Sequence, residues 1–130
     1  MCPVYINRIA SIHAESSNEK PYFSAKEPDY KEMITNANLR RRMSRMIKMG
    51  VACGLECLKD IPPEKVDAII TATGLGCLAD TEKFMNALMD NREQMLNPTA
   101  FIQSTFNTIG AQIALLLKIH AYNVTYVHRG

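Results

Sequence analysis

The sequence has no large excess of charge of one sign. Its 130 residues carry 15 Lys and Arg against 13 Asp and Glu, a formal net charge of +2 at pH 7. This balance argues against a nucleic-acid-binding surface, and 47% hydrophobic residues exclude a disordered chain. Four arginines cluster at Arg40, Arg41, Arg42 and Arg45, where an apolar helix begins; we interpret them as a solvated or paired helix end, with a phosphate contact as the alternative. One folded domain over residues 1–130, without a nucleic-acid partner, is expected.

The sequence also lacks the spacings of a disulfide or metal framework. Four cysteines are scattered along the chain, without paired short spacings or a signal peptide. Cys53 and Cys57 lie one helical turn apart, but no histidine has a ligand spacing to them. We interpret them as small buried residues and expect no metal, no cofactor and a cytoplasmic location.

No stretch is both long and apolar enough to span a bilayer. The most apolar segment, 106–117, is interrupted only by Asn107, Thr108 and Gln112, and as a helix it is too short for a membrane. Because it has almost no polar face, we expect it in the centre of the domain, capped by Ser104 or Thr105. A membrane partner is therefore not expected.

The rest of the chain alternates predicted strands and helices. The predicted elements are a strand at 4–12, a polar loop at 13–30, a helix at 36–58, a strand at 66–73, a helix from Asp80 or Thr81 to Leu88, the central helix and a strand at 124–128. Helices between strands favour a parallel sheet with right-handed crossovers, and the apolar run at 66–73 is expected to be buried on both faces. The predicted class is α/β, with a mostly parallel sheet and a central buried helix.

Two glycines stand beside the apolar stripe of the predicted helix at 36–58. Gly50 and Gly54 each cost about 1 kcal/mol against alanine in a helix, so we expect another element to pack closely on them. The stripe itself follows helical steps and consists of Met43, Ile47, Val51, Leu55 and Leu58.

A glycine-containing turn, 74–77, follows the second strand and precedes a helix. A strand, glycine turn and helix can hold a phosphate at the helix N-terminus. However, TGLGCL matches neither the dinucleotide-binding fingerprint nor a P-loop. We therefore interpret it as a tight turn, and keep a small α/β module that binds an anionic ligand as the alternative.

Three strings in order resemble one known family. They are RRRMSRMIKMGVACGLECL, IITATGLGCLADTEKF and FIQSTFNTIGAQIALLLKIHAYNVTYV. Together they resemble the N-terminal half of a β-ketoacyl synthase of the thiolase-like fold, with Ser44 where the family usually has aspartate. The resemblance implies that the chain is one part of a larger, pseudo-duplicated fold.

The resemblance implies a role in the decarboxylative condensation of acyl thioesters, in fatty-acid or polyketide biosynthesis. The implied partners are an acyl carrier protein and a second synthase chain, as a homodimer or as a heterodimer with a catalytic ketosynthase. Counted from Asn123-Val124-Thr125, the place of the family's nucleophilic cysteine falls on Gly130, and the site histidines would come from the other half. We therefore predict a non-catalytic, chain-length-factor-like chain; the alternative is a condensing enzyme that is active at full length.

Seven residues are candidates for an acyl-tunnel wall or a dimer interface under this resemblance. Their apolar character and their places in the matching strings support this, while core packing is the alternative for each. His128 is interpreted as a packed or interface side chain without a catalytic role. The candidates are Met85, Phe101, Phe106, Asn107, Ile109, Gly110 and His128.

Overall fold

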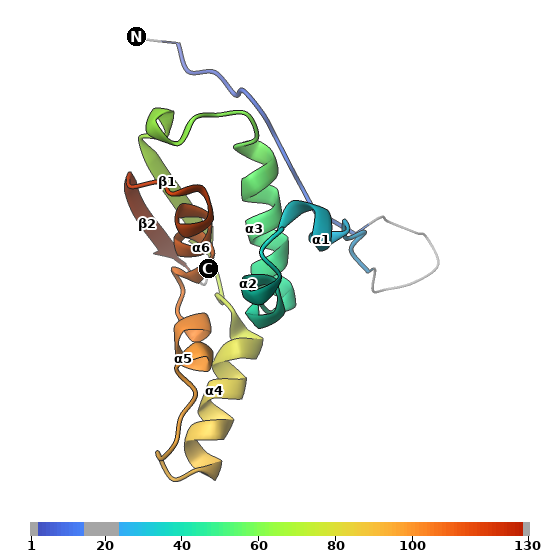
Figure 1. Cartoon of the computed structure of the whole chain (residues 1–130). Helices are drawn as coiled ribbons and strands as arrows, with labels where there is room; N and C mark the ends of the chain where they lie inside the picture. The colour runs from blue at the N-terminus through green and yellow to red at the C-terminus, as the bar shows by residue number, and fades with distance from the viewer. Residues whose placement is uncertain (1–2, 15–23, 129–130) are drawn as a thin grey trace.

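The computed structural model of the chain describes residues 3–14 and 24–128. Its elements are α1 (Tyr30–Met33), α2 (Ala37–Arg42), α3 (Arg45–Cys57), the 3-10 helix η1 (Pro63–Lys65), β1 (Ala68–Thr73), α4 (Leu78–Asp90), α5 (Pro98–Ser104), α6 (Thr108–Leu117) and β2 (Tyr122–Val127). The strands and α6 form one end of the molecule beside α3, and the pair α4 and α5 extends away from them (Figure 1). This confirms the predicted α/β class.

The two strands pair in parallel, as predicted. The register runs from Ala68 opposite Tyr122 to Thr73 opposite Val127, and α6 packs on both strands. Ile69 faces the core and is buried, whereas Ile70 is 65% exposed. The prediction that this strand is buried on both faces is wrong, because no described element covers the face opposite α6.

Close packing of α3 on α6 explains the two helix glycines. A Cβ built on Gly50 would lie 2.8 Å from Ile109 Cγ2, and one on Gly54 would overlap Ile113. The predicted need for close approach is therefore confirmed. The buried apolar core around this contact comprises Ile34, Met43, Ile47, Val51, Ile69, Cys77, Ile113 and Ile119.

Two helix boundaries differ from the predictions. The expected single helix at 36–58 is broken at Met43, which takes an extended conformation (φ −74°, ψ 133°) and is buried in the core. The Gln103 side-chain amide donates a hydrogen bond to the Arg42 carbonyl. A residue that is distant in sequence thus supplies a donor to a carbonyl at the end of α2 that has no partner within the helix. The central helix begins after Asn107 instead of at Ser104 or Thr105.

The central helix is only partly enclosed. Thr108, Gly110 and Ile113 are buried, but Leu115 is exposed among the described residues. No single helix of the described ranges is long and apolar enough to cross a membrane; α5 and α6 reach that length only together, with a 108° bend between them.

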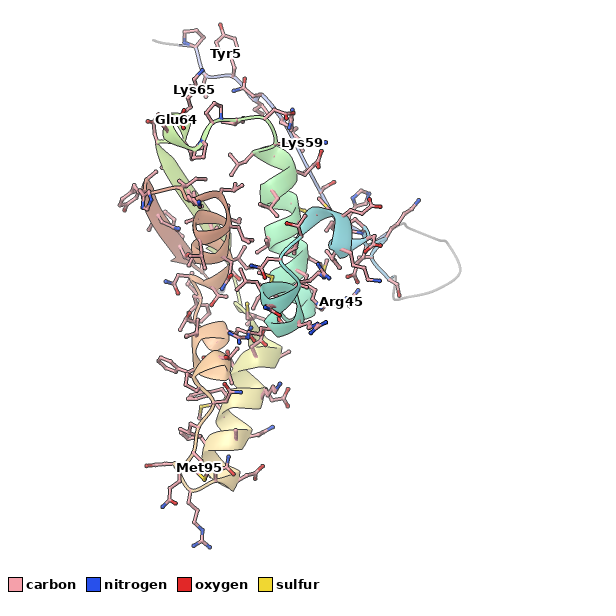
Figure 2. All side chains as sticks on the ribbon, in the orientation of Figure 1. Tyr5, Arg45, Lys59, Glu64, Lys65 and Met95 are labelled. Carbon is pink, nitrogen blue, oxygen red and sulfur yellow. The ribbon has the colours of Figure 1, made fainter. Side chains whose placement is uncertain are left out.

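The predicted first strand does not form. In the described chain its residues join no sheet, and only an isolated bridge pairs Ala14 with Ala25. Val4 is 95% exposed, and the segment that carries Tyr5 runs outside the two-stranded sheet (Figure 2). Arg8 instead anchors the segment, donating to the carbonyl oxygens of Glu56 (3.1 Å) and Lys59 (2.7 Å) at the end of α3. The apolar pattern was typical of a strand, but a strand also needs a neighbouring edge.

Smaller differences concern the predicted loop at 13–30 and the bounds of the last strand. Residues 15–23 of the predicted loop lie outside the described residues, and α1 begins at Tyr30. The last strand begins at Tyr122, two residues earlier than predicted, and ends at Val127.

Candidate functional site

The turn at the carboxyl end of β1 is closed by an aromatic ring. Gly76 has φ +62°, and its amide donates to Thr73 Oγ1 at 2.9 Å. A Cβ on Gly76 would lie 2.5 Å from Phe106 Cδ1, so the ring of Phe106 covers the turn. The first turn of α4 also contains the carboxylate of Asp80, which opposes a bound anion. Both observations favour tight-turn geometry over the anion-binding alternative.

Helices α4 and α5 form a pair that presents apolar side chains to solvent. The Phe84 and Phe101 rings pack with centroids 5.5 Å apart, and the Thr81 hydroxyl donates to the Ser104 carbonyl at 3.3 Å. Although the pair is held together in this way, much of its apolar surface is uncovered. We call this surface the hairpin surface; its exposed side chains are Leu78, Met85, Met89, Phe101 and Ile102.

The structure divides the seven candidate residues between surface and interior. Met85 and Phe101 lie on the hairpin surface, 48% and 56% exposed. Phe106 lies at the Gly76 turn, and Asn107 caps α6 without a side-chain hydrogen bond. Met85 and Phe101 belong to the packed pair of α4 and α5, whereas Phe106 and Asn107 lie in the connection from α5 to α6 (Figure 1).

The other three candidates lie in or beside the sheet. Ile109 is half-buried against Gly50. A Cβ on Gly110 would lie 2.8 Å from Asn123 Oδ1, so this glycine allows α6 to approach the sheet. His128 is exposed, and its amide donates to the Thr73 carbonyl at 3.1 Å. Core packing therefore accounts for Ile109 and Gly110 within this chain, and a tunnel or interface role for the set remains a prediction.

Two of the described cysteines, Cys53 and Cys77, are poorly suited to nucleophilic catalysis. Burial raises the pKa of the Cys77 thiol, and the nearby Asp80 carboxylate raises it further. The pKa of Cys53 is also raised, mainly by burial and then by Cys57. A thiol with a raised pKa has little thiolate at neutral pH, and thiolate is the attacking species. In residues 3–14 and 24–128, no group of three or more His, Cys, Asp or Glu could hold a metal ion.

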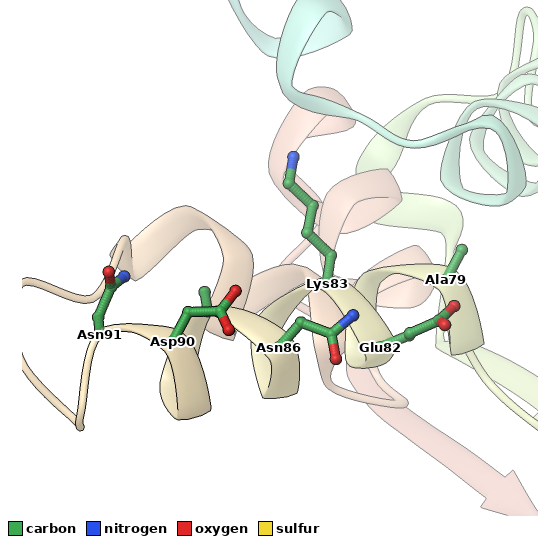
Figure 3. A pocket seen from close by; sticks show the side chains of 7 residues that line it. Ala79, Glu82, Lys83, Asn86, Asp90 and Asn91 are labelled. Carbon is green, nitrogen blue, oxygen red and sulfur yellow. The ribbon is translucent and has the colours of Figure 1, made fainter.

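One face of α4 is polar. Glu82, Asn86 and Asp90 follow each other at one-turn intervals beside Lys83 (Figure 3). All four side chains are exposed, as is typical of a solvated helix face.

Sequence reasoning missed the burial of Asp80. It placed Asp80 or Thr81 at the start of the helix, whereas the cap is Cys77 and Asp80 is 8% exposed in the first turn. An acidic residue is a common feature of a first turn, and nothing in its neighbours indicates that α2 and α5 would enclose it.

The arrangement of β1, α4, α5, α6 and β2 is that of a thiolase-like N-terminal half. The family model "Beta-ketoacyl synthase, N-terminal domain" matches residues 13–125. The chain therefore belongs to the β-ketoacyl synthase family.

A solved structure shares the fold at low sequence identity. It is a ketosynthase (ApeO) in complex with its chain length factor (ApeC) from Xenorhabdus doucetiae, matched with a TM-score of 0.63 and 22% identity. The match covers 82% of this chain and 41% of that chain, so this chain spans less than half of its neighbour's length. No curated protein sequence matches the chain well enough to serve as a relative.

Proposed function

We propose that this chain is the N-terminal domain of a chain-length-factor-type subunit. It pairs with a catalytic ketosynthase in a cytoplasmic pathway of fatty-acid or polyketide type. There it shapes the space for acyl chains that are presented on an acyl carrier protein, and it contributes no nucleophile. The proposal rests on the count from Asn123-Val124-Thr125, which assigns the place of the family's nucleophilic cysteine to Gly130.

The position of β2 supports the count to Gly130. Thr125 lies in β2, and its hydroxyl is 2.6 Å from that of Thr71 in the paired strand β1. Because β2 runs parallel to β1, the chain leaves β2 at the carboxyl edge of the sheet. Open α/β sheets bind their ligands at this edge. Gly130 itself lies outside the described residues, and glycine offers no side chain to acylate.

The cysteines support a non-catalytic role for this domain. Cys77 is the described cysteine nearest that edge, but it is buried and its pKa is raised. A general base or a cation would be needed to favour its thiolate. Instead, the neighbouring group is the carboxylate of Asp80.

The hairpin surface supports a partner subunit. Aromatic and methionine side chains are enriched in the cores of protein interfaces, and large exposed apolar patches mark interaction sites. Phe101 is the aromatic residue of this surface that is more than half exposed. We place the ketosynthase contact there.

Replacing Phe101 by Asp tests this contact. A buried charge without a partner weakens an interface, so the dissociation constant of the complex with the ketosynthase is expected to rise at least about tenfold. Affinity is measured by analytical ultracentrifugation of the purified pair. Asn86→Asp, on the polar face of the same helix pair, is the matched control and should leave affinity unchanged. Equal affinities of the Phe101→Asp variant and the native chain would show that the contact lies elsewhere.

A further inference from the structure

Two thiols lie one helical turn apart on α3. Cys53 and Cys57 were interpreted from the sequence as small buried residues, but both are free cysteines that are only half-buried. Residues four apart on a helix have Cβ atoms about 5–6 Å from each other. A disulfide needs a Cβ separation of about 3.5–4.5 Å, so an intact α3 opposes a direct bond between the two sulfurs. Their spacing instead suits a single ion that bridges two sulfur atoms.

A cavity of about 360 Å³ opens onto the thiol-bearing side chain of Cys53. It lies between the N-terminal segment and the helices α1 and α3, which pack on each other (Figure 1). Met33 of α1 lines the same cavity, so a thioether from a second helix and the thiol of Cys53 face one space. The cavity also provides a path by which a small ion reaches the thiols.

The surroundings of Cys53 favour a metal-bound thiolate. The Ile12 amide hydrogen-bonds to the Cys53 sulfur, and such outer donors orient and stabilise a ligating group. Arg8 places a positive charge at the same end of α3, where its guanidinium donates to two backbone carbonyl oxygens. Burial raises the pKa of Cys53 and limits attack by the free thiol, but a metal ion displaces the thiol proton when it binds.

This set of side chains selects a soft metal ion. Thiolates and thioethers are the ligands that Cu(I) prefers, and two or three sulfur atoms are enough to hold it. A structural Zn²⁺ site needs four ligands, and in residues 3–14 and 24–128 no group of three or more His, Cys, Asp or Glu could supply them. Two thiolates and one Cu(I) leave one negative charge, which the Arg8 guanidinium offsets.

We propose that Cys53 and Cys57 bind one Cu(I) ion as thiolates, with the Met33 thioether as a weaker third ligand. Binding releases the two thiol protons to water and leaves copper and sulfur in their original oxidation states. The proposal rests on α1, α3 and the N-terminal segment, and it does not depend on pairing with a ketosynthase.

Competition with a coloured Cu(I) complex tests the site. The reduced protein is titrated without oxygen into Cu(I) bicinchoninate, and it is expected to withdraw one equivalent of copper. In the ¹⁵N-labelled protein the amide of Ile12, which hydrogen-bonds to Cys53, should shift in proportion to the bound copper. A protein that withdraws no copper, or that binds copper while the Ile12 amide is unchanged, would overturn the proposal.

Three variants assign the ligands. Cys53→Ser and Cys57→Ser should each lower the Cu(I) affinity at least about a hundredfold, because each removes one of two thiolates. Met33→Leu keeps a similar apolar volume and should lower the affinity about three- to tenfold. Circular dichroism checks that each variant is folded. If a serine variant does not fold, Met33→Leu and the shift of the Ile12 amide still decide.

Three control variants remove sulfur atoms elsewhere in the chain. Cys2→Ser and Cys77→Ala remove the other two cysteines, and Met89→Leu removes an exposed thioether on α4. None of them should change the Cu(I) affinity. An affinity that falls in Cys2→Ser or Cys77→Ala and is kept in folded Cys53→Ser would contradict the assigned site.

Discussion

At the scale of single residues, Gly110 determines how closely α6 can approach the sheet. A Cβ at this position would lie 2.8 Å from Asn123 Oδ1 and 3.4 Å from Thr71 Cγ2. Both neighbours belong to the paired strands, so neither can move without disturbing the sheet.

Gly110→Leu is therefore expected to lower the free energy of unfolding by about 1–3 kcal/mol, because an overpacked contact forces the helix from the strands. Urea unfolding followed by circular dichroism measures this. Ala111→Leu is the matched control, since Ala111 is exposed on the same helix, and its effect should stay within about 0.5 kcal/mol. Similar effects for the two variants would mean that Gly110 is not a packing position.

Glu27 links α1 to α3 through two hydrogen bonds. Tyr30 donates to its Oε2 at 2.6 Å, and Arg45 donates to its Oε1 at 2.5 Å. The hydrogen bond from Tyr30, followed by that from Arg45, lowers the pKa of this carboxyl group below its ordinary value of 4.5. The carboxylate therefore stabilises the fold above the ordinary pKa, and this stabilisation is lost as the pH falls through the lowered pKa.

Glu27→Gln should consequently lower the urea midpoint at about pH 7, and the gap to the native protein should close as the pH falls below the carboxyl pKa. Urea midpoints over a pH series give the gap directly. Glu82→Gln, on the solvent face of α4, should show no such pH-dependent gap. A gap that persists unchanged in acid would contradict the assigned hydrogen bonds.

At the scale of elements, the buried residues of a helix could be predicted where the periodicity of its own sequence indicates which face is apolar. The stripe of Met43, Ile47 and Val51 was predicted from helical periodicity, and all three are buried. Gly50 and Gly54 indicated close packing because their intrinsic helix propensity is poor.

What could not be predicted depends on distant contacts. The break between α2 and α3 is stabilised by Gln103, 61 residues away from Arg42. Asp80 is enclosed by α2, which precedes it in the sequence, and by the α5 segment, which follows it. The segment at 4–12 has the composition of a strand, but pairing also needs an available edge, which composition does not encode.

Arg8 determines where the N-terminal segment lies. Its guanidinium group donates to two carbonyl oxygens at the C-terminal end of α3, where carbonyls lack helical partners. The amide of Ile12 further along the segment hydrogen-bonds to Cys53 and lowers that thiol's pKa, against the larger effect of burial.

Arg8→Ala is expected to cost about 1 kcal/mol of stability and to speed hydrogen exchange at the Ile12 amide, because the segment loses its anchor. Hydrogen exchange followed by NMR measures the opening of the N-terminal segment and of α3 in the same experiment. In Lys59→Ala the accepting carbonyl is kept, so exchange at Ile12 should match the native protein. Unchanged exchange in Arg8→Ala would show that Arg8 does not hold the segment.

At the scale of the whole molecule, apolar surface is exposed in three separate places. Tyr126 and Ile70 lie on the uncovered sheet face, Val4 on the N-terminal segment and Phe101 on the hairpin surface. Patches of this kind mark interaction sites. The match to the solved structure covers only 41% of the neighbour's chain. The family could be predicted from ordered sequence strings, whereas these surfaces required the fold.

The measurement that tests the central claim is the intact mass of each subunit after acylation. The native protein is co-purified with the ketosynthase that we propose as its partner, incubated with an octanoyl thioester and analysed by mass spectrometry. The account predicts one octanoyl group on the ketosynthase and none on this chain, because the proposal assigns the nucleophile's place to Gly130, which has no side chain to acylate. An octanoyl group on this chain, mapped to one of its cysteines, would contradict a non-catalytic role.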